Sequence, residues 1–215
     1  MNKIFIFSAG PGGRDVLQLI KDINKEKKVW EVLGFVDTDL DLKDKSIDGI
    51  KVYLPEDLQK QNKDNFFGIC GVLDPTIRES IVQNEIIPLG YKIPSLIHPT
   101  AVIADDFVPE EGLIIFSGVN ISYNVSINKY VLVSFSCLVG HDSKIGEYSS
   151  LLPASLMDGR CIVGKKTILG SGAILHPEVK VGSKATIGMG TVVLNDVEEG
   201  ITLTQMPRMI KLNNK

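Results

Sequence analysis

The sequence is poor in cysteine and has no long apolar run. Its three cysteines, Cys70, Cys137 and Cys161, are an odd number without the spacing of metal ligands, so neither a disulfide framework nor a metal site is expected. No apolar run reaches the roughly 18 residues of a membrane-spanning helix, and the Ile/Phe run near the N-terminus breaks at glycines, too early for a signal peptide. We therefore expect a cytoplasmic protein that does not associate with membranes.

The sequence also lacks a block of basic residues. Its 23 Lys and Arg and 26 Asp and Glu residues give a formal net charge of −3, which provides no footprint for nucleic acid or for an anionic membrane. With 44% hydrophobic residues in a chain of 215, a substantial core can form, and the length allows two small domains. The expected partners are small molecules and further copies of the chain.

Residues 1–95 show the alternation of strands and helices that is typical of a parallel sheet. Three short apolar runs predict strands, at residues 4–7, 32–36 and 66–72. Two amphipathic stretches predict helices; the inward residues are Val16, Leu19, Ile20 and Ile23 in the first, and Ile77, Ile81 and Val82 in the second, over 75–83. This pattern predicts a small Rossmann-like βαβ domain.

From about residue 100 the helical period is replaced by an internal repeat of six residues. One column of the repeat is entirely aliphatic: Ile115, Ile121, Ile127, Val133, Val139, Ile145, Leu151, Met157, Val163, Leu169, Leu175, Val181, Ile187 and Val193. A second column is small or β-branched: Val119, Val125, Val131, Cys137, Ser143, Ser149, Ser155, Cys161, Thr167, Ala173, Val179, Ala185 and Thr191. Amino-acid composition alone would very rarely give two such columns in register.

A unit of short strand plus corner, three per coil, predicts a triangular solenoid over residues 96–215, ending in a C-terminal cap. Glycines directly after many aliphatic positions supply tight corners, where a side chain would clash or φ must be positive. Cys137 and Cys161 belong to the inward small column, so both are expected to be core thiols. The fold class is α/β plus β.

The hexads resemble those of the hexapeptide-repeat acyltransferases, and this resemblance implies a left-handed β-helix, a homotrimer and acyl-CoA as donor. The whole chain is similar to the sugar O/N-acyltransferases of the sialic acid acetyltransferase and bacillosamine-precursor N-acetyltransferase group. The segments that carry this resemblance are 8–16, 34–37, 73–78, 97–101 and 139–146. Departures from the group's pattern are Ser8 in place of a glycine, Pro11, Arg14, and Thr204–Pro207 in place of Gly-Asn-Pro-Ala.

Three histidines compete for the role of general base in acetyl transfer. His98, in Ile-His-Pro at the domain junction, is most simply a structural hydrogen-bonding residue, and Pro177 favours a turn at His176. His141 lies in a corner after Val139 and Gly140 and is followed by Asp142. In the resembling enzymes the histidine of this motif is the base, and the adjacent acid orients it.

Gly159 lies eighteen residues after His141, which is one full coil, and should therefore stack beside it. Its backbone N–H is the candidate donor for the oxyanion of the transition state, a role that the resemblance also implies; the alternative is a plain corner glycine. The resemblance further implies that acetyl-CoA is the cosubstrate and that Gly159, Ser171, Gly188 and Gly190 contact it between two subunits.

In the N-terminal domain, the glycine turn before the first helix is a ready anion site. Asp37 ends the second strand, where such folds place a carboxylate that binds a ribose or base. The resemblance implies that a nucleotide-sugar diphosphate lies near this turn. The candidate substrate-binding residues are Gly10, Gly12, Gly13, Arg14 and Asp37.

The repeat runs unbroken from residue 115 to 193, which leaves no room for a long acceptor-binding loop. The N-terminal domain is therefore expected to supply most of the acceptor recognition. This favours an acceptor that carries a nucleotide. The leading hypothesis is acetyl-CoA-dependent N-acetylation of a nucleotide-linked amino sugar in surface-glycan biosynthesis. The alternatives are O-acetylation of a sialic-acid-like sugar, and a β-helix that binds a sugar nucleotide or scaffolds an assembly without catalysis.

Overall fold

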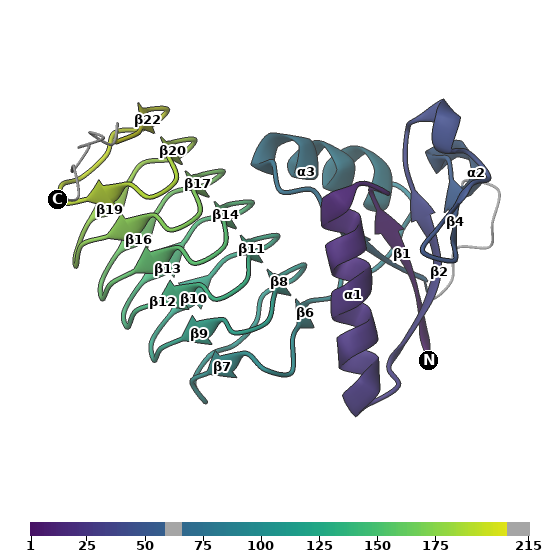
Figure 1. The fold of residues 1–215 in the computed structure, drawn as a ribbon, viewed down its shortest axis with the longest axis horizontal. Helices are drawn as coiled ribbons and strands as arrows, with labels where there is room; N and C mark the ends of the chain where they lie inside the picture. Colours follow the sequence, from purple (N-terminus) through teal and green to yellow (C-terminus); the bar gives the residue numbers. More distant parts are fainter. Residues whose placement is uncertain (59–65, 206–215) are drawn as a thin grey trace, which may run out of the picture.

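The computed structural model describes residues 1–58 and 66–205 and has an α/β unit followed by a three-sided β-helix (Figure 1). The α/β sheet has the order β3-β4-β2-β1-β5. Its strands are β1 (Asn2–Phe7), β2 (Trp30–Val36), β3 (Ser46–Ile47), β4 (Ile50–Tyr53) and β5 (Phe66–Cys70), all parallel except for β3. The helices are α1 (Pro11–Glu26), α2 (Pro55–Leu58) and α3 (Pro75–Ile81), with a short 3-10 turn η1 (Leu40–Leu42) and a π-helical turn η2 (Val82–Ile86) that continues α3.

The core of this unit forms where the apolar runs predict it. Residues 4–7 of β1 are at most 2% exposed, and Val16, Leu19 and Ile20 of α1 pack against the sheet. The prediction that Ile77 faces inward is wrong, because this side chain is 53% exposed. The buried residue of α3 at that level is Arg78, since this face of the helix lies against the β-helix. The hairpin of β3 and β4 gave no apolar run and was not predicted.

The β-helix consists of two-residue strands at six-residue intervals, stacked in three parallel sheets. The seven-stranded sheet, sheet C, contains β6 (Leu96–Ile97), β8 (Ile114–Ile115), β11 (Leu132–Val133), β14 (Ser150–Leu151), β17 (Ile168–Leu169), β20 (Thr186–Ile187) and β22 (Thr202–Leu203). The six-stranded sheet, sheet D, contains β7 (Val102–Ile103), β9 (Asn120–Ile121), β12 (Leu138–Val139), β15 (Leu156–Met157), β18 (Ile174–Leu175) and β21 (Val192–Val193). The four-stranded sheet, sheet E, contains β10 (Ser126–Ile127), β13 (Lys144–Ile145), β16 (Ile162–Val163) and β19 (Lys180–Val181).

Successive coils pair at an offset of eighteen residues, as in Val139 with Met157. Both predicted columns are buried: the aliphatic column is at most 3% exposed and the small column at most 9%. Cys137 and Cys161 lie in this core as free thiols. The predicted left-handed β-helix behind a Rossmann-like domain is confirmed. The domain boundary at 95/96 stays a prediction, and most of the predicted C-terminal cap lies outside the described residues.

The corner glycines are required by close stacking and not by their own backbone angles. A Cβ on Gly140 would lie 2.6 Å from the backbone of Asp158 in the next coil. Positive φ belongs to a different column, which steps by six and includes Asn124, Asp142 and Arg160. Asp142 is therefore held in the left-handed conformation by the corner in which it lies.

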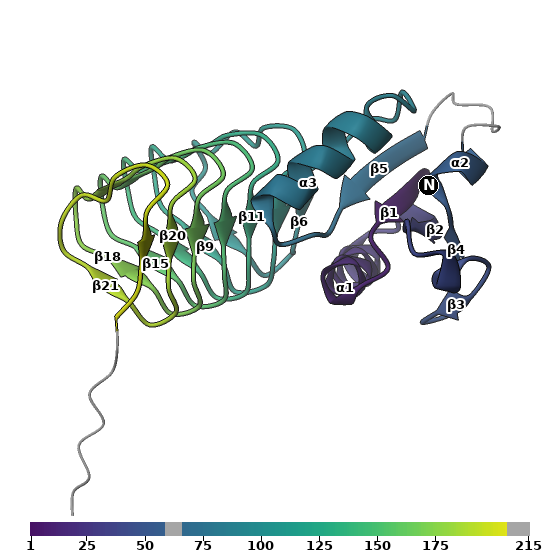
Figure 2. The same ribbon diagram turned by 90° about the horizontal axis from the view of Figure 1, so that it is seen from above.

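Helix α3 lies beside the β-helix (Figure 2), and its buried Arg78 joins the two parts of the chain. Its guanidinium donates hydrogen bonds to the carbonyls of Tyr130, Tyr148 and Ser149 in the β-helix and to those of Val72 and Leu73 in its own domain. Burial lowers the pKa of Arg78 to about 10, so it remains protonated at neutral pH. Among the described residues, no helix is long and apolar enough to cross a membrane.

Candidate active site

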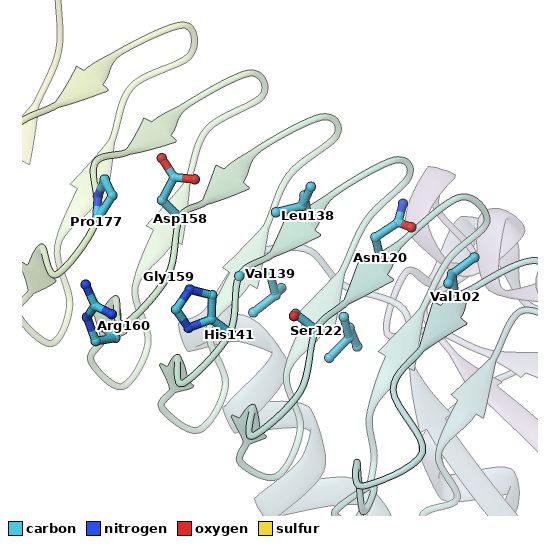
Figure 3. A pocket seen from close by; sticks show the side chains of 12 residues that line it. Val102, Asn120, Ser122, Leu138, Val139, His141, Asp158, Gly159, Arg160 and Pro177 are labelled. Atoms are coloured by element: carbon cyan, nitrogen blue, oxygen red, sulfur yellow. The ribbon is translucent and has the colours of Figure 1, made fainter.

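A cavity of about 510 Å³ lies on the β-helix at the corner between sheets D and E (Figure 3). Outward side chains of sheet D, Val102, Asn120 and Leu138, form one wall, and the corners that follow β12 and β15 supply His141 and Gly159. The His141 ring points away from the coil, because corner side chains face outward while the strands fill the core. It is 37% exposed and open to a ligand.

His141 is held by a carboxylate on one ring nitrogen. Its Nδ1 lies 2.7 Å from Oδ2 of Asp142, whose other oxygen accepts a hydrogen bond of 2.6 Å from Nδ2 of Asn124. The hydrogen bond with His141, followed by that from Asn124, lowers the pKa of Asp142. With a carboxylate on Nδ1, the proton of a neutral imidazole resides there and the lone pair on Nε2 is free to act as a base.

Gly159 lies directly against the free edge of this ring, as the one-coil offset predicts. A Cβ on Gly159 would lie 2.5 Å from Nε2 of His141, so a side chain fits at this position only if the imidazole moves. Within the part of the chain that the structure describes, the Gly159 N–H has no hydrogen-bond partner. The base nitrogen and an unpaired backbone donor therefore lie side by side, which is the arrangement that acyl transfer requires.

Two residues of the site were missed by the sequence analysis, Tyr123 and Asn124. The Tyr123 ring stacks on the His141 ring with centroids 5.3 Å apart and an interplanar angle of 9°. Both residues lie eighteen positions before the His141–Asp142 pair. The offset of eighteen residues that predicts the contact of His141 with Gly159 also predicts contacts with residues eighteen positions before the pair, and this signal identifies Tyr123 and Asn124.

Ser171, Gly188 and Gly190 lie at a different corner from His141. They follow β17 and β20 of sheet C and precede strands of sheet D, whereas His141 follows a strand of sheet D. Within one chain the structure thus does not bring them to the His141 cavity. Their predicted contact with acetyl-CoA stays a prediction that involves a neighbouring subunit.

The glycine turn of the N-terminal domain is shaped mainly by close packing. A Cβ on Gly12 would collide with the Gly71 carbonyl, and one on Gly13 with the Ser8 carbonyl, while Gly10 has more space. Ser8 adopts a φ of 94°, in the region that favours glycine, the residue of the group's pattern at this place, and its Oγ accepts a hydrogen bond from Gly10 N–H. At the start of α1, the N–H groups of Gly12 and of the buried Gly13 have no partner among the described residues, and unpaired N–H groups at a helix N-terminus attract anions.

The two remaining predicted substrate-binding residues are both engaged within the protein. Arg14 pairs with Asp48, with Nε 2.8 Å from Oδ2, and does not line the cavity that contains Asp37. Asp37 accepts hydrogen bonds from the N–H groups of Ala9 and Asp39. Asp37 nevertheless lines a second cavity, of about 450 Å³, at the carboxyl ends of β1, β2 and β5.

The other two histidines lie where a structural role is expected. Nε2 of His98 is 3.4 Å from Asp22 of α1, and its Nδ1 accepts a hydrogen bond from Thr100 N–H, so His98 ties the domain junction together. His176 is exposed, and its Nδ1 lies 3.2 Å from the Pro177 carbonyl. The contact of His98 with Asp22 is longer than the 2.7 Å between His141 and Asp142, and it occupies Nε2, the nitrogen that is free in His141.

No protein-family model matches the chain. Over 180 residues, 81% of this chain and 78% of the relative, the chain is 29% identical to GDP-perosamine N-acetyltransferase of Escherichia coli O157:H7. It also resembles the solved acetyltransferase domain of PglB from Neisseria gonorrhoeae FA1090, with 25% identity, a TM-score of 0.83 and coverage of 95% and 97% of the two chains. These likenesses confirm the predicted resemblance to the hexapeptide-repeat N-acetyltransferases of the nucleotide-amino-sugar group.

A further likeness supports the fold of this N-acetyltransferase. PerB from Caulobacter crescentus, solved in complex with CoA and GDP-perosamine, matches with a TM-score of 0.86 and 23% identity over 98% of each chain. Together the comparisons confirm the predicted group, the enzyme class, N-acetylation of a nucleotide amino sugar, and acetyl-CoA as cosubstrate. The assignments of individual site residues stay predictions.

Proposed function

We propose that the enzyme acetylates the amino group of a nucleoside-diphosphate-linked sugar with His141 as general base, Asp142 as its orienting carboxylate and Gly159 N–H as oxyanion donor. The observation that carries the proposal is the juxtaposition of His141 Nε2 and Gly159 at one corner of the β-helix. The E. coli relative, by its name, acts on GDP-perosamine, which supports a nucleoside-diphosphate sugar as acceptor.

In the proposed reaction the sugar amine attacks the thioester carbonyl carbon of acetyl-CoA. His141 Nε2 takes the proton that the nitrogen loses, and Asp142 stabilises the resulting imidazolium through Nδ1. The Gly159 N–H donates to the carbonyl oxygen as negative charge develops there. The C–S bond then breaks, the CoA thiolate leaves, and the proton held by His141 passes to it, which regenerates the neutral imidazole.

The N-terminal domain would hold the nucleotide. Unpaired N–H groups at the start of the 16-residue helix α1 suit the diphosphate, since the helix dipole adds positive potential there. The adjacent cavity that contains Asp37 has room for the nucleoside. We also place the enzyme in the cytoplasm, where acetyl-CoA and nucleotide sugars are made, and its product in surface-glycan assembly.

Assembly as a homotrimer is part of the proposal and is supported by an apolar stripe on sheet D. The outward residues of this sheet are Val102, Asn120, Leu138, Leu156, Ile174 and Val192. Sheet E presents Ser126, Lys144, Ile162 and Lys180 instead. An exposed apolar stripe on a protein of this size marks a contact surface. The His141 cavity opens onto sheet D, whose opposite edge bears the Ser171 corner, so a second copy would complete the acetyl-CoA site.

The central test of His141 is its replacement by alanine. We expect His141→Ala to lower kcat for thiol release from acetyl-CoA with a nucleotide amino sugar by about 10²- to 10⁴-fold. His176→Ala, at an exposed histidine of the same edge, is the matched control and should keep kcat within about threefold of wild type. Near wild-type turnover by His141→Ala would refute the assignment of the base. Turnover only with hydroxyl acceptors would favour O-acetylation, and tight binding without turnover would favour a scaffold.

A further inference from the structure

The nucleoside cavity of the N-terminal domain contains a second carboxylate, Glu85, that the proposed reaction does not use. Glu85 belongs to η2, where the helix widens to a π-helical turn marked by the hydrogen bond from Ile87 N–H to the Val82 carbonyl. Such turns are frequent at functional sites. Ile77, Ser80 and Ile81 of the preceding helix line the same cavity, so Glu85 lies along a continuous wall.

The Glu85 carboxylate has an unused capacity to accept hydrogen bonds. It is partly buried, and among the described residues it has no hydrogen bond or ion pair through its side chain. Burial, followed by the charge of Asp37, raises the pKa of Glu85. The residues that line the cavity include no lysine, arginine or histidine. Asp37 already accepts two backbone N–H groups, so Glu85 is the free acceptor of the pair.

A carboxylate accepts hydrogen bonds and donates none when ionised. The two carboxylates of this cavity therefore suit a neutral group that carries donors and disfavour the diphosphate, which the N-terminus of α1 suits better. Apolar side chains on two sides, Phe7 and Val36 from the sheet and Ile77 and Ile81 from α3, form walls for a flat ring. A nucleobase fits this combination of walls and acceptor.

The four common nucleobases differ in the donors that they offer to a carboxylate. Guanine has two adjacent donors, N1–H and the N2 amino group, which match the two oxygens of a carboxylate. Uracil has a single N3–H between two carbonyl oxygens, and one of these would face the second carboxylate oxygen. Adenine and cytosine each place a ring-nitrogen acceptor beside their amino group, with the same repulsion.

We propose that Glu85 is the residue that selects guanine, by accepting hydrogen bonds from N1–H and the N2 amino group of a guanosine-diphosphate-linked sugar. This rests on the proposed function only in that the N-terminal domain binds the nucleotide. It makes Glu85 a specificity-determining residue outside the reaction centre. A site built around such hydrogen bonds rejects a base that lacks the donors strongly, because the buried acceptor is then left unpaired.

Calorimetric titration of the full-length enzyme with GDP and with UDP, without acetyl-CoA, tests the proposal. Wild type should bind GDP at least about tenfold more tightly than UDP. Glu85→Gln keeps the shape of the side chain but turns one oxygen into a donor, which suits uracil N3–H and its neighbouring carbonyl. This variant should weaken GDP binding by about tenfold or more, leave UDP binding unchanged or stronger, and so remove the preference. Glu31→Gln on the exposed surface of β2 is the matched control and should behave as wild type.

The outcomes separate this proposal from the proposed catalysis. Equal affinity of wild type for GDP and UDP, or equal weakening of both in Glu85→Gln, would overturn guanine selection, the latter pointing to a ribose contact. A GDP preference that depends on Glu85, in an enzyme that acetylates no GDP-linked amino sugar, would sustain this proposal and refute the proposed function. If His141→Ala loses turnover while wild type prefers UDP, the result would support the proposed function and refute guanine selection.

Discussion

At the residue scale, the His141 ring occupies the space that a side chain on Gly159 would need. This is a steric constraint between neighbouring coils, since Gly159 does not have the positive φ that favours glycine elsewhere. The constraint links the two proposed catalytic groups, because any side chain at 159 must displace the imidazole from its place beside Asp142.

Gly159→Ala should therefore lower kcat about 10²-fold, the typical effect of moving a catalytic group by about 1 Å. The fold should persist, since the collision is with a movable side chain at the surface. Circular dichroism and acetyl transfer measured on the same sample check both statements. Gly118→Ala is the control, at a corner outside the cavity where the new Cβ would lie 3.2 Å from Ser136 Oγ. Its φ of +70° is one that non-glycine residues adopt at equivalent corners, such as Ser136 and Asp142, so this variant should retain activity. Similar losses in both variants would show that Gly159 is only a corner glycine.

At the scale of secondary-structure elements, α3 is connected to the β-helix by a buried cation. Arg78 is 2% exposed and donates to backbone carbonyls of both domains and to Ser150 Oγ. Ser150 in turn donates to the Leu73 carbonyl, 2.6 Å away. The junction is therefore a satisfied polar network inside the molecule, which is costly to break at any one member.

Arg78→Met should reduce the free energy of unfolding by more than about 3 kcal/mol, because it leaves several buried carbonyls without donors. Urea denaturation at fixed protein concentration measures this. Arg14→Met, which removes an exposed ion pair with Asp48, is the control and should cost less than about 1 kcal/mol. A loss of similar size in the two variants would contradict the role given to Arg78.

These elements also show what the sequence could predict. The β-helix, both inward columns and the proximity of His141 to Gly159 follow from one period, because a solenoid turns a fixed sequence offset into a contact. In the cluster around Arg78, by contrast, this side chain contacts β-helix residues 52 to 72 positions further along the chain, and no sequence period predicts these contacts. For the same reason Arg78 was missed and Ile77 was placed in the core: helix amphipathicity indicates which residues are apolar, but not that a neighbouring domain will supply carbonyls to a cation.

At the scale of the whole molecule, the proposed trimer depends on the exposed apolar face of sheet D. Ile174 on that sheet and Ile162 on sheet E are 37% and 39% exposed and occupy equivalent outward positions. Ile174→Lys should dissociate the assembly and lower activity more than about tenfold, since a buried unpaired charge opposes the contact. Ile162→Lys should leave the assembly intact. Sedimentation analysis of both variants decides the matter, and an unchanged mass for Ile174→Lys would remove sheet D from the interface.

The Arg78 junction bears on the length of substrate that the enzyme accepts. Because the buried network fixes α3 to the coils, the separation between the nucleoside cavity, whose wall includes α3, and the corners that carry His141 is built into the fold. The fixed distance between the two sites then selects a sugar that is joined to its nucleoside by a linker of one length. A sugar joined to its nucleoside through a single phosphate should therefore be a poorer acceptor than one joined through a diphosphate.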